Sequence, residues 1–241
     1  MAVIMSKQFV APKFRTPASD LEVGGTVFLN VEGVPREFII IHQGNPDTSF
    51  YHGSCDGTWL MMKDILYTNT WGPYNVNYHV AHNRLTSAFV PLLDADVQEC
   101  MHTVIIPYAG LDDESDDTVF KGSEGLSGKA FLLSVKEIGA TGVASISGVA
   151  MPKDGVQLDY FKNVANGDSK LIAYYDGVAT KWFTRTRGPT DEGTQGRVVW
   201  TVTAEGTIDI DASYDQNGHR PVIILPPNAT FSTKGTFMGV V

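Results

Sequence analysis

Two apolar segments in the last third of the chain each carry a single arginine inside a strand-like run. The first is Trp182-Phe183-Thr184-Arg185-Thr186, and the second runs from Gly218 through Arg220 to Pro226. A buried guanidinium destabilises a protein unless its N–H donors are hydrogen-bonded. Two such segments close together therefore predict a specific scaffold, in which both arginines are locked inside the closing strands of a sheet.

Most of the chain is typical of short strands joined by turns. Its 24 glycines and 12 prolines favour a loop-rich fold over a helical bundle. A hairpin is expected around Ala204-Glu205-Gly206, because the residues after it alternate between apolar and acidic. Strand-like runs are found at residues 26–31, 37–43, 58–64, 103–108, 179–187, 197–203, 207–213 and 219–225.

Helical spacing is convincing only at residues 79–101. Leu85, Phe89 and Leu92 recur at helical intervals, Pro91 then interrupts the pattern, and Asp94 can cap a second short helix. Strands together with two short helices predict an α+β fold class.

Composition and charge exclude several classes of function. The net charge of −9 disfavours binding to nucleic acid phosphates. No apolar stretch approaches the length of a membrane helix, and the chain start lacks the apolar core of a signal peptide. Cys55 and Cys100 have neither metal-ligand spacing nor a disulfide framework. We expect a chain made in a reducing cytoplasm, with no membrane insertion, no metal and no cofactor.

The first twenty residues are predicted to form an extended N-terminal arm, because Pro12 and Pro17 disfavour regular structure. Such an arm could dock on a neighbouring subunit or lie on its own domain, and the sequence leaves both open. Residues 21–241 are predicted to form one domain, since no further boundary is visible.

Several segments resemble an uncharacterised domain family that is common in gut bacteria, especially clostridia, and in their phages. They are residues 37–47, residues 54–64, Trp182-x-x-Arg185 and Gly218-x-Arg220-Pro221, and the resemblance spans about residues 21–226. The last two motifs are also similar to the C-type lectin fold of formylglycine-generating enzymes and phage tropism determinants. The resemblance implies a C-type lectin-like fold with small twisted antiparallel sheets and two short helices.

In such folds the resemblance implies that Arg185, Arg220 and Trp182 are structural residues and that the C-terminal strands and loops form a binding surface. Exposed aromatic side chains would give this surface large contact area at low entropic cost. Trp200 and Tyr214 could equally be core residues. The candidate contact residues are Thr184, Thr186, Asp191, Thr194, Gln195, Val199, Trp200, Asp209, Asp211, Tyr214, Asp215, Asn217 and His219.

The function expected from this reasoning is non-enzymatic. We expect a phage virion protein, such as a tail fibre tip, that recognises a host cell-surface protein or glycan. The N-terminal arm would contact other virion proteins, and a homo-oligomer, with a trimer favoured, would suit a fibre tip. A capsid decoration or tail scaffold protein is the main alternative.

Enzymatic and metal-dependent alternatives find less support in the sequence. A formylglycine-generating enzyme would need paired thiols near the end of the domain, whereas Cys55 and Cys100 lie in the first half. Asn45-Pro46-Asp47 superficially matches the triplets of calcium lectins, but turn chemistry explains it. No Gly-x-Ser-x-Gly nucleophile motif occurs, and the His79 and His82 pair lacks a carboxylate nearby in sequence.

Overall fold

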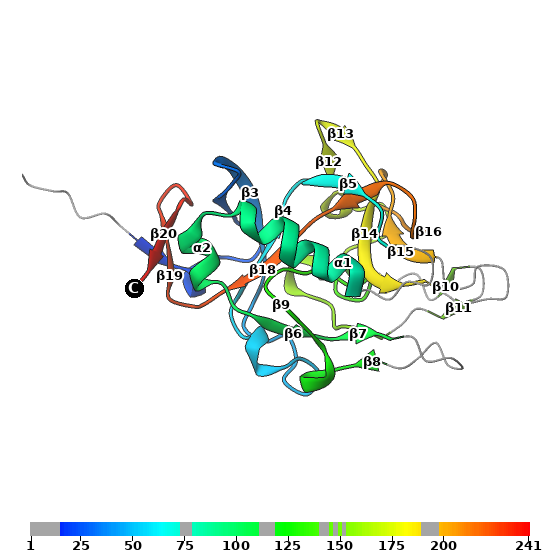
Figure 1. Cartoon of the computed structure of the whole chain (residues 1–241), viewed down its shortest axis with the longest axis horizontal. Helices are drawn as coiled ribbons and strands as arrows, with labels where there is room; N and C mark the ends of the chain where they lie inside the picture. Colours follow the sequence, from blue (N-terminus) through cyan, green and yellow to red (C-terminus); the bar gives the residue numbers. More distant parts are fainter. Residues whose placement is uncertain are drawn as a thin grey trace, which may run out of the picture.

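The computed structural model describes residues 15–72, 79–110, 119–139, 145–146, 149–150, 153–188 and 198–241. Its architecture is mostly β, with many strands in several sheets and a curled, half-barrel arrangement (Figure 1). The α+β, C-type lectin-like fold expected from the sequence is therefore wrong. Over the described residues, one interrupted helical segment, a second short helix and single 3-10 turns account for the helical structure.

One sheet has four antiparallel strands in the order β18-β4-β3-β2. These are β18 (Val222–Leu225), β4 (Thr58–Met62), β3 (Val34–Gln43) and β2 (Thr26–Val31). Every residue of β18 and β4 is buried, so both strands are covered on both faces. This explains why their sequences are apolar, apart from Thr58 at the start of β4, instead of alternating.

A second sheet has five strands in the order β16-β15-β14-β17-β5. These are β16 (Ile208–Ala212), β15 (Val198–Val202), β14 (Trp182–Arg187), β17 (Asn217–His219) and β5 (Tyr67–Asn69). The β15–β16 hairpin forms as predicted, and Gly206 in its loop has a φ of 76°, which glycine adopts without strain. The pairing of β14 with β17 is parallel and was not predicted.

The two ends of the described chain meet in a third sheet of order β1-β19-β20. Here β1 (Arg15–Pro17) pairs with β19 (Ala229–Ser232), which pairs with β20 (Phe237–Val240). The predicted arm is therefore too long, because its residues from Arg15 onward belong to the folded domain. Pro17 is compatible with a strand here because β1 is an edge strand. Residues 1–14 lie outside the described part of the chain.

The helical pattern gives α1 (His79–Arg84), a π-helical turn (Leu85–Phe89), a 3-10 turn (Val90–Leu92) and then α2 (Ala95–Cys100). Pro91 lies in the 3-10 turn, so the interruption predicted there is confirmed. Asp94 precedes α2 as predicted, but its carboxylate accepts from Asn30 Nδ2 (2.6 Å) instead of capping the helix. No helix among the described residues is long and apolar enough to cross a membrane.

The remaining strands are short pairs. β6 (Val104–Ile106) pairs with β9 (Leu126–Gly128), and β7 (Tyr108–Ala109) pairs with β8 (Val119–Phe120). β10 (Ser145–Ile146) pairs with β11 (Val149–Ala150). β12 (Tyr174–Tyr175) and β13 (Val178–Ala179) form a hairpin whose two turn residues both have positive φ, at Asp176 and Gly177. Further 3-10 turns occur at Ala18–Asp20, Gly53–Cys55, Gly122–Glu124, Asp159–Phe161 and Ser169–Leu171.

Candidate functional site

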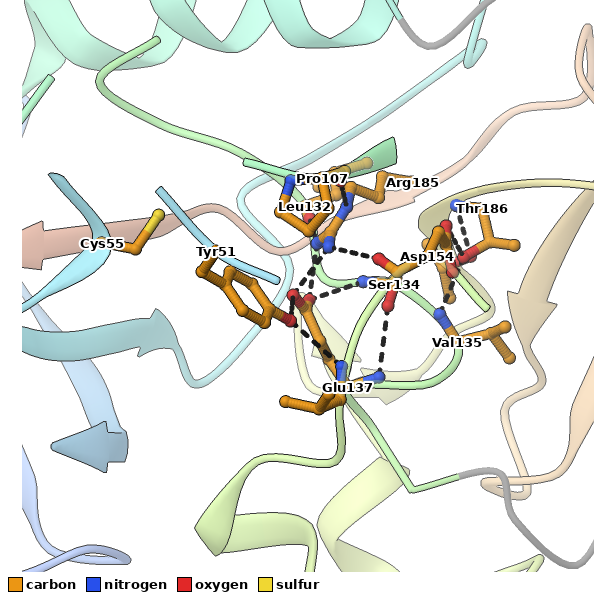
Figure 2. A network of polar contacts seen from close by, with 12 residues as sticks. Tyr51, Cys55, Pro107, Leu132, Ser134, Val135, Glu137, Asp154, Arg185 and Thr186 are labelled. Atoms are coloured by element: carbon orange, nitrogen blue, oxygen red, sulfur yellow. Dashed lines mark hydrogen bonds and ion pairs between the residues drawn. The ribbon is translucent and has the colours of Figure 1, made fainter. Parts of the chain in front are cut away.

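Arg185 of β14 is buried at the centre of a polar network and uses all five of its N–H donors (Figure 2). Its Nε donates to the carbonyl of Pro107 (2.8 Å). Nη1 donates to the carbonyl of Leu132 (3.0 Å) and to Glu137 Oε2 (2.5 Å). Nη2 donates to Glu137 Oε1 (2.6 Å) and to the carbonyl of Asp154 (2.9 Å). The guanidinium is therefore fully satisfied without water.

Glu137 is oriented by its own backbone turn. The amide of Ser134 donates to Glu137 Oε2 (2.8 Å), and the amide of Glu137 donates to Ser134 Oγ (3.2 Å). This reciprocal Ser-x-x-Glu arrangement has the geometry of a capping box. Tyr51 Oη adds a hydrogen bond to Oε1 (2.6 Å), so both carboxylate oxygens have two donors.

The electrostatics of this network hold Arg185 and Glu137 as an ion pair. Burial alone lowers the pKa of the Arg185 guanidinium, but the charge of Glu137 outweighs burial and raises that pKa. Burial, together with the charge of Glu137, raises the pKa of the Tyr51 phenol well above its usual value. The phenol therefore remains a neutral hydrogen-bond donor.

Asp154 is a second buried carboxyl beside this pair. Its Oδ2 accepts from Thr186 Oγ1 (2.7 Å), and that hydroxyl in turn accepts from the amide of Val135 (2.9 Å). Oδ1 of Asp154 is buried without a hydrogen-bond partner. Burial raises the pKa of the Asp154 carboxyl to about 6, although the nearby Arg185 guanidinium opposes this change.

Arg220 is also buried, as predicted, but it is held differently. Its guanidinium lies 4.8 Å from the centre of the Trp182 ring, and its Nε and Nη2 donate to the carbonyls of Met62 (3.3 Å) and Lys63 (2.7 Å). Within the described ranges no carboxylate forms an ion pair with it, and burial lowers its pKa to about 10. Arg185 is therefore stabilised by an ion pair, and Arg220 by carbonyls and an aromatic ring.

Six of the ten predicted contact residues that the structure describes are buried. Central strands β14 and β15 are covered on both faces, so their polar residues point into packed protein. His219 of β17 is buried as well, since its ring stacks on Tyr67 (4.9 Å between centres) and meets Phe183 edge-on, with both nitrogens unpartnered. The predicted contact residues that are buried are Thr184, Thr186, Val199, Trp200, Asn217 and His219. Asp191, Thr194 and Gln195 lie outside the described residues.

The other predicted contact residues gather on and after β16. Contacts link Lys181, Asp209, Asp211 and Asp215, and Tyr214 directly precedes Asp215 in the sequence. We term these five residues the carboxylate face. Lys181 Nζ lies 3.0 Å from Asp211 Oδ2 and 3.9 Å from Asp209 Oδ2. Tyr214, at the turn that follows β16, is 47% exposed.

The carboxylates of this face are held in place by hydrogen bonds. Partial burial raises the pKa of Asp211, but the donors Asn217 and Lys181 outweigh burial and hold that pKa below its usual value. The hydrogen bond that Asp215 shares with Asp211 raises the pKa of Asp215. The two carboxyls are therefore close enough to titrate as a pair.

The edge of β16 is closed to strand addition. Its three outward amides donate to side chains: those of Ile210 and Ala212 to the preceding aspartates (2.9 and 3.0 Å), and that of Ile208 to Asn166 Oδ1 (2.8 Å). Unpaired edge amides invite pairing with another chain, and side-chain capping removes that opportunity. A partner on this side would therefore contact side chains.

Three residues of the buried network escaped the sequence reasoning: Tyr51, Glu137 and Asp154. The sequence held a usable signal for Glu137, because Ser134-x-x-Glu137 has capping-box spacing.

In the described part of the chain, no group of three or more His, Cys, Asp or Glu residues is placed to hold a metal ion. His82 of the predicted histidine pair is buried, with Nε2 2.8 Å from the carbonyl of Ser127.

Comparison with known proteins gives a family and no function. No curated protein and no solved structure matches the chain. The match to a family covers residues 56–227, well over half of the chain, and includes Glu137, Asp154, Arg185 and Arg220. The chain therefore belongs to the family described as a domain of unknown function, DUF6273.

Proposed function

We propose that this chain is a non-enzymatic recognition domain of a bacteriophage particle, which binds a glycan or protein on the host cell through the carboxylate face. The observation that carries the proposal is an exposed tyrosine, Tyr214, directly before Asp215 in the sequence, where Asp215 belongs to a pre-ordered group of carboxylates. The sequence resemblance described above supports a phage particle as the place where this domain acts.

The chemistry of the carboxylate face defines what it can hold. Ionised carboxylates only accept hydrogen bonds, so Asp209, Asp211 and Asp215 favour a partner rich in hydroxyl or cationic donors. Tyr214 offers an apolar ring and a polar hydroxyl with few rotatable bonds, a combination that is frequent in binding surfaces. Lys181 anchors two of the carboxylates, which lowers the ordering cost on binding.

The buried ionisable groups of the domain serve a structural role in the proposal. Arg185, Glu137 and Tyr51 bind each other inside the domain and leave no donor of the guanidinium free. A rigid interior supports loops whose positions vary little, which is what a recognition surface requires.

Binding of the purified protein to glycan arrays and to intact host bacteria tests the proposal. The single variants Tyr214→Ala and Asp215→Asn should each weaken binding at least tenfold, since an interface hot spot contributes about 2 kcal/mol or more. Val34→Ala, at an exposed position of β3 outside the carboxylate face, is the matched control and should bind as the parent does. Equal binding by all three proteins would show that the carboxylate face is not the contact surface.

A further inference from the structure

A groove of about 610 Å³ lies at the sheet formed by the two ends of the described chain. Arg15 and Pro17 of β1 line it, with Ser19 just beyond, and Pro227, Asn228, Thr230 and Val241 line its other side. Its volume is in the range of sites that bind small molecules or peptide segments. Apart from Pro227, the last residue matched by the family, the lining residues of the groove lie outside the match, and none of them belongs to the carboxylate face.

The register of the sheet shows on which face the groove lies. Arg15 and Pro17 alternate along β1, so their side chains share one face, and Pro17 is paired with Thr230 across the sheet. The other face carries Thr16 and its partner Phe231, whose buried ring packs against Phe237 (5.7 Å) in the core. The groove is therefore on the outer face of this sheet, away from the core.

We propose that this groove binds residues 2–10 of a second copy of the chain, so that the N-terminal arm links neighbouring copies. The segment begins Ala2-Val3-Ile4-Met5, which is apolar enough to cover Pro17, Pro227 and Val241. Val241 is 76% exposed without such a cover. Burial of these apolar surfaces supplies the driving force.

Length and charge both fit an arm that reaches another copy. Fourteen residues precede Arg15, and at about 3.3–3.6 Å per residue they span roughly 46–50 Å when extended. Residues 1–14 contain Lys7 and Lys13 and no carboxylate, so the rest of a chain of net charge −9 carries −11. The net charge therefore attracts the arm to a second body. Within the groove the charged lining side chain is the cationic Arg15, so the apolar part of the arm is the part that fits there, and the arm lysines would be paired with carboxylates outside it, such as exposed Asp20 next to Ser19.

A second copy fits this groove better than the arm of the same chain. The arm leaves at Arg15, which itself lines the groove. Four residues separate residue 10 from Arg15, so the same chain would have to reverse its direction within those four residues to bring residues 2–10 back to a groove that Arg15 itself lines. The groove lies over the face of the sheet, and the arm of another copy can approach that face directly.

Mass measurement of the full chain by light scattering gives the first test. Ser19→Trp places a large side chain in the groove and should reduce the assembly to the monomer mass of 26.2 kDa, whereas Ser19→Ala should keep the parent mass. Ile4→Asp should act like Ser19→Trp, and Ile4→Leu should act like the parent. A monomeric parent protein, or an unchanged mass for Ser19→Trp and Ile4→Asp, would overturn the proposal.

Disulfide trapping distinguishes a second copy from the same chain. A protein carrying both Ile4→Cys and Ser19→Cys should form covalent dimers and higher species under mild oxidation, and each single variant is a control for pairing between identical sites. An internal cross-link within the monomer would overturn the proposal, as would no cross-link at all. Cys55 and Cys100 interfere little, because burial raises their thiol pKa values to about 12 and about 11. Neither test requires binding to a host cell, so failure of the recognition proposal leaves this one intact.

Discussion

Replacing Asp154 with asparagine should change how the stability of the protein depends on pH. The Asp154 carboxyl has a pKa of about 6 in the folded protein, against an ordinary value of 3.8. A raised folded pKa means that the native state holds the proton more tightly than the unfolded state. The stabilisation from this proton is complete below pH 3.8 and is lost as the pH rises through 6.

The magnitude follows from the difference of about two pKa units. At about 1.4 kcal/mol per unit, the carboxyl costs the native state about 3 kcal/mol at pH 7 relative to acid. Asparagine resembles the protonated side chain, does not titrate, and keeps an oxygen that can accept from Thr186. Relative to the parent, the variant should therefore gain about 2–3 kcal/mol in free energy of unfolding between pH 4 and pH 7.5.

Urea unfolding followed by tryptophan fluorescence can measure this difference, because all four tryptophans are buried in the native state. The reasoning is refuted if the variant and the parent differ by the same free energy at every pH. His219→Phe supplies a control of opposite sign. Burial lowers the pKa of His219 from 6.5 to about 4, so its contribution is present above pH 6.5 and is lost as the pH falls through 4.

Four further substitutions test the packing. Arg185→Met should cost about 3–5 kcal/mol of stability because it leaves a buried carboxylate unpaired. Arg220→Met should cost less because only carbonyls lose a partner. A lower melting temperature for Arg220→Met than for Arg185→Met would contradict this. Ser134→Ala should cost about 1 kcal/mol by removing the capping hydroxyl, and no change in urea midpoint would argue against the capping box. Gly218→Ala places a Cβ 2.5 Å from Ile65 Cδ1 and should cost about 1–3 kcal/mol, a loss that Ile65→Ala should partly reverse if the clash causes it.

Sequence patterns predicted the elements that local chemistry determines. The strand predicted at residues 26–31 is β2, and the hairpin of β15 and β16 has its glycine at the expected loop position. Strands β5, β12 and β13 were missed because each has only two or three residues, too few to establish alternation. Their pairing depends on partners far away in sequence.

The fold class was wrong because a resemblance in two closing motifs was extended to the whole chain. Trp182-x-x-Arg185 and Gly218-x-Arg220 do lie side by side, since Trp182 of β14 is paired with Gly218 of β17. That local pairing does not determine how many helices surround it. The buried contact residues of β14 and β15 were placed at the surface for a related reason. Alternation predicts an exposed face only when one side of the sheet is open, and these two strands are covered on both sides.

The partners of Arg185 show where single-sequence reasoning reaches its limit. A buried arginine needs a buried counter-charge, but the sequence contains 27 acidic residues and does not show which of them supplies it. Glu137 lies 48 positions before Arg185 in the sequence, and Tyr51 lies a further 86 positions before Glu137. None of the bonds in this network comes from β1, β19 or β20. A family member could therefore lose the end-to-end sheet and its groove while keeping the ion pair, so assembly and recognition can vary independently on one interior.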